Sequence, residues 1–204
     1  MTVPSQLSPG DSKTLHAVMQ QFNNYAYLEI GSYLGGSLHF HLTNPKCKHA
    51  ISVDTRQTGQ IRDERNIPYA YTTTTQDMLD IFLEHNIPTE RLTTVDGSVA
   101  QVPTAHIDLI FVDGEHTNSA VYSDAKECVR FTPQVILFHD DWIVSQGLEA
   151  AAQELTDYTL LKIAHCDISA LVANTARDQF KLTTVPWAEF ITQAKTRMEH
   201  YANT

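Results

Sequence analysis

The chain has 204 residues and a formal net charge of −10. This length fits one domain with its own hydrophobic core, so we expect a single domain over residues 1–204, of which 1–10 are polar and predicted to form a loose tail. The negative charge disfavours nucleic acid and anionic membranes as partners. No apolar stretch has the length of a membrane span. The cysteines are odd in number and widely spaced, which predicts reduced thiols in a cytoplasmic protein.

Short apolar runs alternate with helical patterns along the chain. Ser12 is predicted to cap a first helix that ends near Asn24. Five strands are predicted next, at residues 25–30, 50–53, 92–95, 107–112 and 135–138, with helices at 37–42, 76–85 and 119–131. The last third predicts a helix at 148–155, strands at 159–163 and 170–173, and a helix at 187–201. This order indicates a parallel sheet covered by helices on both faces.

Acidic or small residues lie at the carboxyl end of each of the five predicted strands. They are Glu29 with Gly31, Asp54, the segment 96–98, Asp113 and the segment 139–141. In open α/β sheets, ligands bind beyond the carboxyl ends of the strands. Carboxylates near a core also need partners. The pattern therefore predicts a ligand site along this edge.

The segment LEIGSYLGGS reads as a strand, a tight glycine turn and the start of a helix. Its spacing is not that of a dinucleotide-binding turn. Glu29, before the first glycine, suits a cationic ligand such as an α-ammonium or a sulfonium. Asp54 ends the next strand, where a carboxylate can accept both hydroxyls of a ribose.

These residues resemble a known family. LEIGSYLGGS with ISVD, followed by the segment FVDGEHTNSA and by ILFHDDW, is similar to class I S-adenosylmethionine-dependent methyltransferases, especially small-molecule O-methyltransferases of the catechol type. The likeness covers roughly residues 25–175. It implies an α/β, Rossmann-like fold with a mostly parallel seven-stranded sheet.

The resemblance also implies cofactor contacts. The methionine part of S-adenosylmethionine would meet Glu29, Gly31, Ser32, Tyr33 and Ser37, and the remaining contacts would be Asp54, Gly97, Ser98, Val99 and Asp113. Two departures stand out. Val99 and Ala100 occupy adenine positions that are often polar in relatives, and residues 132–134 replace a common glycine pair.

Three acids, Asp113, Asp140 and Asp141, follow the fourth and fifth predicted strands, and neither motif around them contains Lys or Arg. Converging carboxylates would repel one another, so we expect a divalent cation, with Mg²⁺ favoured and Ca²⁺ or Mn²⁺ as alternatives. Relatives hold a metal at the equivalent positions. The alternative is that one of the adjacent pair only caps the helix near Trp142.

His116 follows Asp113 on the same loop. Catechol-type relatives carry a catalytic Lys there, so His116 is predicted as the general base, with Asp113 beside it. The alternative is a histidine that hydrogen-bonds the loop or orients the substrate. His139 is expected either to support a metal ligand or to be structural.

The predicted function is metal-assisted O-methylation of a hydroxyl on a small molecule. Two alternatives are a metal-independent methyltransferase that relies on His116, and a non-catalytic S-adenosylmethionine-binding module. The first and last helices are candidates for a homodimer contact. The acceptor itself is not encoded in any motif.

Overall fold

The computed structural model describes residues 3–56 and 61–202. Its centre is an eight-stranded sheet of order β10-β8-β9-β7-β6-β1-β2-β5. The strands are β1 (Tyr25–Ile30), β2 (Cys47–Asp54), β5 (Leu92–Asp96), β6 (Leu109–Val112), β7 (Val135–His139), β8 (Tyr158–Ile163), β9 (Ile168–Ala173) and β10 (Thr184–Val185). A separate hairpin joins β3 (Ile61–Arg62) to β4 (Pro68–Tyr69).

Strands β5, β2, β1, β6 and β7 are mutually parallel, while β9 runs antiparallel to both β7 and β8. This mostly parallel arrangement confirms the predicted Rossmann-like sheet. It differs in one respect, because the two-residue β10 adds an eighth strand beside β8. The parallel registers place the last residues of these strands in line, so the loops after β1, β2, β6 and β7 leave from one edge.

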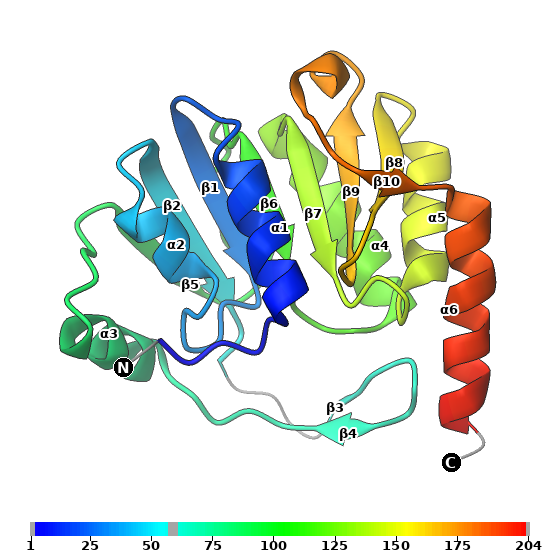
Figure 1. Ribbon diagram of the computed structural model, residues 1–204. Coiled ribbons are helices and arrows are strands. Elements are labelled where there is room, and N and C mark those ends of the chain that lie inside the picture. Colours follow the sequence, from blue (N-terminus) through cyan, green and yellow to red (C-terminus); the bar gives the residue numbers. More distant parts are fainter. Residues whose placement is uncertain (1–2, 57–60, 203–204) are drawn as a thin grey trace.

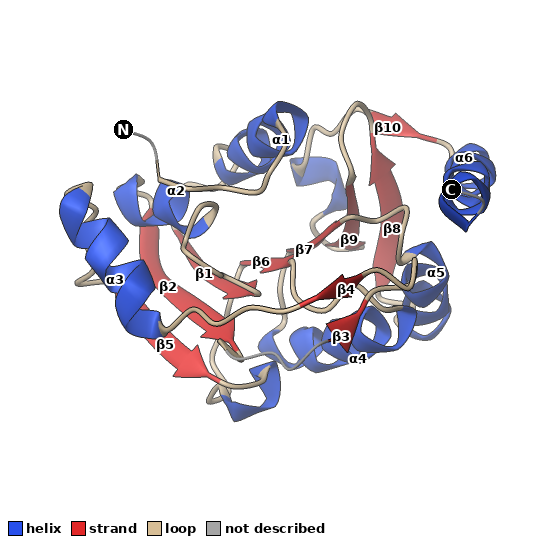
Figure 2. Ribbon diagram, turned by 90° about the horizontal axis from the view of Figure 1, so that it is seen from below, coloured by secondary structure: helices blue, strands red, loops and turns tan. Residues whose placement is uncertain are grey.

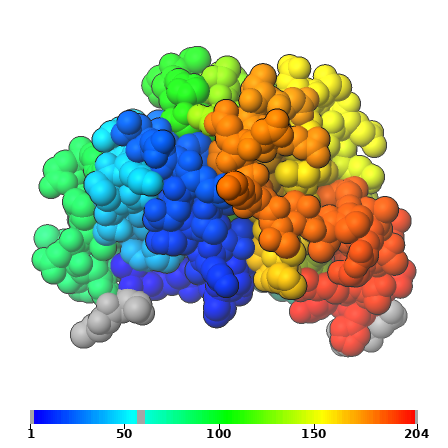
Figure 3. Space-filling view, turned by 45° about the horizontal axis from the view of Figure 1, so that its top comes forward, coloured from blue at the N-terminus to red at the C-terminus, as the bar shows by residue number. Residues whose placement is uncertain are grey.

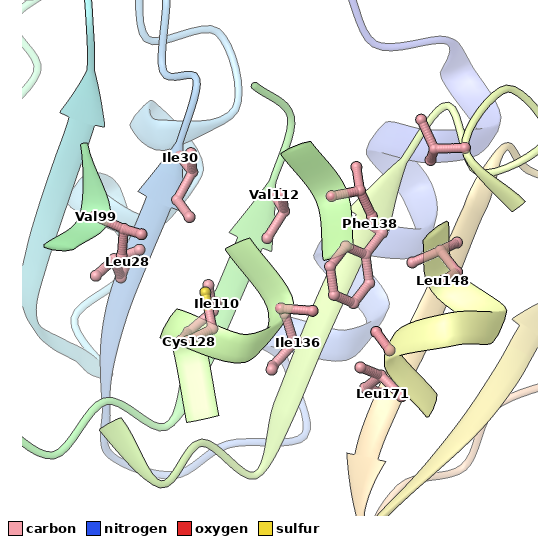
Figure 4. Close-up of a cluster of buried hydrophobic side chains, with 14 of the residues drawn as sticks. Leu28, Ile30, Val99, Ile110, Val112, Cys128, Ile136, Phe138, Leu148 and Leu171 are labelled. Atoms are coloured by element: carbon pink, nitrogen blue, oxygen red, sulfur yellow. The ribbon is translucent and has the colours of Figure 1, made fainter. Parts of the chain in front are cut away.

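Helices cover both faces of the sheet (Figure 1). One face packs against α1 (Pro9–Met19), α2 (Leu38–Thr43) and α3 (Thr75–Glu84). The other packs against α4 (Asn118–Cys128), α5 (Ser145–Glu154) and α6 (Trp187–Ala202). Alternate residues of each central strand supply the two cores, since Ile136 and Phe138 of β7 join the second one (Figure 4) while Val135 and Leu137 join the first.

The N-terminal segment differs from the sequence prediction. Ser8, not Ser12, caps α1, and it forms a reciprocal capping box with Asp11. The helix ends at Met19, short of the expected Asn24. Residues 3–8 form neither helix nor strand, but they differ from the expected loose tail over residues 1–10, because Val3 is buried, residues 4–7 line the cavity described below, and α1 begins at Pro9. Residues 4–10, PSQLSPG, contain one large apolar side chain, which is too few for a pattern that would predict this packing.

The β3–β4 hairpin was not predicted. Seen from below, it lies across the edge of the sheet from which the loops leave (Figure 2). All three cysteines are free thiols. Within residues 3–56 and 61–202, none of the helices is both long enough and apolar enough to cross a membrane.

Candidate functional site

A cavity of about 450 Å³ opens at the carboxyl edge of the parallel strands. Its walls come from the loops after β1, β2, β5 and β6, from residues 4–7, and from the hairpin with the segment that follows it. The volume lies in the range typical of sites for cofactors and small molecules. The sequence elements that were predicted to carry a ligand therefore do surround a space for one.

The turn after β1 is shaped by a close approach of two backbones. Gly31 has a φ of +83°, and a Cβ at this position would lie 2.1 Å from the Asp113 carbonyl oxygen. Only glycine tolerates both conditions. The absence of a side chain lets the loop after β1 lie directly against the loop after β6, which brings Asp113 to the cavity beside the glycine turn.

Asp54, at the end of β2, holds the same turn from the other side. Its Oδ2 accepts the backbone N–H of Tyr33 at 2.7 Å, and its Oδ1 accepts that of Arg56 at 2.8 Å. The Arg56 guanidinium, itself buried, donates to the Tyr33 carbonyl and to Ser52 Oγ. Asp54 lines the cavity, so one carboxylate both shapes the turn and faces the ligand space.

Glu29 lies behind the cavity wall and does not line it. Its carboxyl is fully buried and accepts hydrogen bonds from Tyr27 Oη at 2.5 Å and from Ser37 Oγ at 2.6 Å. Burial raises the pKa of Glu29 to about 8. Of these groups, Ser37 faces the cavity, so the expected contact of Glu29 with the methionine amino group would run through Ser37.

The other predicted cofactor residues are brought together. All of them line the cavity: Gly31, Ser32, Tyr33, Ser37, Asp54, Gly97, Ser98, Val99 and Asp113.

Asp113 and His116 face the cavity side by side. Asp113 Oδ1 lies 3.3 Å from His116 Nε2, and the other ring nitrogen, Nδ1, lies 3.2 Å from Asp140 Oδ2. Burial works against charge on His116, but these two carboxylates outweigh it and raise the pKa of the imidazole above its ordinary value. Asp140 has a φ of 50°, an unusual conformation that Asp tolerates better than most residues.

His139 extends the cluster toward α1. Its Nδ1 lies 2.9 Å from the same Asp113 Oδ1, and its Nε2 lies 3.4 Å from Asp11 Oδ2. Burial would lower the pKa of His139, yet Asp113 and Asp11 raise it to about 11. Carboxylates and imidazoles thus alternate in one chain of contacts, in the order Asp140, His116, Asp113, His139, Asp11.

Asp141 does not join this cluster, which corrects the expected grouping with Asp113 and Asp140. Its carboxylate is fully buried and lies 2.7 Å from Lys162 Nζ, and it accepts a hydrogen bond from Ser169 at 2.6 Å. The prediction failed because the neutralising base comes from β8, not from the motif around Asp141. Adjacent residues at a strand end also point to different sides.

The sequence did not indicate some of the residues that line or support the cavity. Asp11 signals only a helix start, and Arg56 follows Asp54 in a segment without a motif. Tyr69 and Tyr71 line the cavity from the unpredicted hairpin and the chain after it. Their ring centroids lie 5.6 Å apart. The tyrosine spacing was the one available signal, since the pair stands outside any predicted core element.

Comparison with known proteins agrees with this architecture. A family described as methyltransferase domain matches residues 28–142. Among solved structures, an O-methyltransferase from Bacillus cereus in complex with SAH is 14% identical, with 83% of this chain and 84% of that chain covered and a TM-score of 0.57. The O-methyltransferase TomG from Streptomyces achromogenes, involved in tomaymycin synthesis and in complex with SAM, is 15% identical, with 82% of each chain covered and a TM-score of 0.54.

A third solved structure, M. capricolum TrmK with its cofactor product S-adenosylhomocysteine, is 13% identical, with 83% of this chain and 70% of that chain covered and a TM-score of 0.55. At such identities the likeness shows the fold. The curated proteins give no match. The family match covers more than half of the length of this chain. The chain therefore belongs to the methyltransferase domain family. Its fold is the one that these solved methyltransferases share.

Proposed function

We propose that the protein transfers a methyl group from S-adenosylmethionine to a hydroxyl oxygen of a small molecule. The observation that carries this proposal is the pair Asp113 and His116, which lines the cavity next to the glycine turn at Gly31. Two of the similar structures are named O-methyltransferases, which supports oxygen as the acceptor atom.

The size of the cavity favours a small acceptor. Residues 4–7 cover one side and the hairpin another, so little room is left for a polymer beside the cofactor. The formal net charge of −10 works against polyanionic acceptors as well. Free thiols at all three cysteines support the cytoplasm as the compartment of the reaction.

In the proposed reaction the acceptor oxygen attacks the methyl carbon, and the carbon–sulfur bond of the sulfonium breaks. The electron pair of that bond stays on sulfur, which yields S-adenosylhomocysteine, and the hydroxyl proton leaves to a base. Much of the rate of such a displacement comes from holding the two reacting atoms in line. The turn after β1 and the Asp113 loop are the parts that would hold them.

His116 is the proposed base. Because Asp113 and Asp140 raise its pKa, the imidazole keeps its proton up to a higher pH than an ordinary histidine does. A base must first be deprotonated. Transfer that depends on His116 alone should therefore become faster as the pH rises through that raised pKa.

An oxygen-only Mg²⁺ site formed by Asp113, Asp140 and Asp141 does not fit the structure. Asp141 is already neutralised by Lys162 and receives a second hydrogen bond from Ser169. Moving its carboxylate to the cavity would leave the Lys162 ammonium buried without its partner, which is costly.

The test is incubation with S-adenosylmethionine and a panel of small hydroxyl compounds, with mass detection of the methylated product. We expect His116→Ala to lower kcat by roughly 10²–10⁴-fold with little change in S-adenosylmethionine affinity. The matched control is His106→Ala, which removes an exposed His from a different Asp–His pair. Methylation of nitrogen or carbon atoms alone would rule out the proposed acceptor, and a raised KM with unchanged kcat would reduce His116 to a substrate contact.

A further inference from the structure

We propose that Asp113, His116 and His139 form a binding site for a divalent transition-metal cation, such as Zn²⁺, Mn²⁺ or Fe²⁺, and not for Mg²⁺. One ligand atom from each residue lies within 4.8 Å of the others. Asp113 and His116 line the cavity, while His139 is 9% exposed. A cation held here would border the cavity.

The spacing of the ligand atoms suits a single ion. Bonds of about 2.0–2.2 Å from a metal to nitrogen or oxygen place neighbouring ligands roughly 3.0–3.6 Å apart. Asp113 Oδ1 lies 2.9 Å from His139 Nδ1 and 3.3 Å from His116 Nε2. The two nitrogens that would bind therefore already face the same carboxylate oxygen.

The far nitrogen of each ring provides an independent argument. A histidine that binds a metal usually donates its other N–H to a carboxylate or carbonyl, which fixes the ring. His116 Nδ1 lies 3.2 Å from Asp140 Oδ2, and His139 Nε2 lies 3.4 Å from Asp11 Oδ2. The far nitrogen of each ring thus faces a carboxylate. For His116 it is Asp140, directly after β7, and for His139 it is Asp11 of α1.

The donor set decides the class of cation. Two imidazoles with one carboxylate suit Zn²⁺, Mn²⁺ or Fe²⁺, whereas Mg²⁺ prefers oxygen ligands in a near-octahedral arrangement. With three protein ligands, coordination positions remain for groups in the cavity.

The inference that a cation binds here rests on this geometry alone. A role of the cation in methyl transfer rests in addition on the proposed function. A cation here would act as a Lewis acid toward an oxygen. With Nε2 bound and Nδ1 held by Asp140, His116 would have no free nitrogen, so its base role belongs to the cation-free protein. The two roles exclude each other and can be separated by experiment.

The experiment uses the full chain, stripped with a chelator and titrated with Co²⁺ as a coloured probe. Visible absorption and calorimetry should show one equivalent bound, and parallel titrations should show Zn²⁺ binding while Mg²⁺ binds at least about 100-fold more weakly. Absence of a stoichiometric Co²⁺ or Zn²⁺ complex, or tighter binding of Mg²⁺, would overturn the proposal.

Variants locate the site. His116→Ala and His139→Ala should each abolish the stoichiometric Co²⁺ complex, and Asp140→Asn should weaken it about 10–100-fold. His106→Ala, at the exposed pair with Asp108, should leave it unchanged, and circular dichroism checks that each variant is folded. Unchanged Co²⁺ affinity in both folded cluster variants would place the ion elsewhere and refute the assignment.

The same samples distinguish this inference from the proposed function. If the stripped protein methylates hydroxyl acceptors and binds no cation, the inference fails and the proposed function stands. If the cation binds at the three residues and no hydroxyl compound gains a methyl group, the site is supported and the proposed function fails.

Discussion

At the scale of single residues, Asp54 has two tasks. It accepts backbone N–H groups from Tyr33 and Arg56, and each of its oxygens keeps a second lone pair for a ribose hydroxyl. Asp54 is therefore the residue whose loss should most directly report on cofactor binding.

We expect Asp54→Ala to weaken binding of S-adenosylhomocysteine by about 1–3 kcal/mol, the usual loss for hydrogen bonds to a charged group. Calorimetry measures the affinity for S-adenosylhomocysteine. The unchanged protein should bind NAD far more weakly than S-adenosylhomocysteine. The matched control is Asp96→Ala, because Asp96 pairs with Asp54 in register at the end of β5 and is 61% exposed. Equal affinities for Asp54→Ala and the unchanged protein would show that Asp54 only shapes the turn.

The sequence could predict those site residues that end or follow a strand. Gly31, Asp54 and Asp113 were found because an apolar run stops beside each of them. Asp11 and Lys162 could not be found this way. The partners of both residues lie on other elements. His139, for example, is 128 residues away from Asp11 in the sequence. A local sequence pattern carries no information about such distant pairs.

At the scale of elements, the hairpin is tied to α6 by stacked side chains. Arg65, in the turn between β3 and β4, lies 5.4 Å from the ring centroids of both Trp142 and Tyr201. Arg197 of α6 covers Trp142 as well, at 3.9 Å. Trp142 directly follows Asp140 and Asp141 after β7. The side chains of Arg65, Trp142, Arg197 and Tyr201 therefore connect the hairpin, the loop after β7 and α6.

We expect Arg65→Ala to loosen the hairpin, because the variant loses the contacts with the rings of Trp142 and Tyr201 and the ion pair with the buried Asp63 carboxylate. Limited proteolysis should show faster cleavage within residues 61–69. Arg62→Ala is the matched control, since Arg62 donates to Asn66 of its own hairpin. The link to α6 would be refuted by equal cleavage rates in the two variants.

Most elements followed from their apolar patterns, and the three strands that were missed have a common cause. Strands β3, β4 and β10 have two residues each, too few for an alternating pattern to emerge. They form because the remaining structure offers them a partner. The start of α1 was misplaced because Ser8 and Ser12 both suit a cap, and only the reciprocal bonds with Asp11 choose Ser8.

At the scale of the whole molecule, Glu29 links stability to pH. Burial raises the pKa of Glu29 from 4.5 to about 8, so the folded protein binds a proton more tightly than the unfolded chain does. The contribution to stability is fully present below pH 4.5 and is lost as the pH rises through about 8.

We therefore expect Glu29→Gln to remove part of the fall in unfolding free energy between about pH 5 and 8, on the order of a few kcal/mol. Urea denaturation at several pH values measures it. Glu149→Gln, at an exposed position of α5, serves as the control and should follow the unchanged protein. Parallel curves for the unchanged protein and Glu29→Gln would mean that Glu29 is ionised in the folded state.

The segment after α1 also meets a segment late in the chain. In Figure 3, blue residues lie beside orange residues. Lys181 donates its backbone N–H to Gln21 Oε1 at 2.7 Å, and the rings of Phe22 and Phe180 lie 5.2 Å apart. Helix α1 is thus held in place by a segment synthesised much later.

This arrangement sets an order of events during translation. Asp11 leaves the ribosome early, but its two distant partners, His139 and the backbone N–H of Asp167, follow 128 and 156 residues later. Strands β1, β2, β5 and β6 can pair before then, because domains begin to fold from the N-terminus as they emerge. The half-made chain would already possess the glycine turn and Asp54, whereas Asp11 could take its place behind His139 only after His139 and Asp167 have been synthesised.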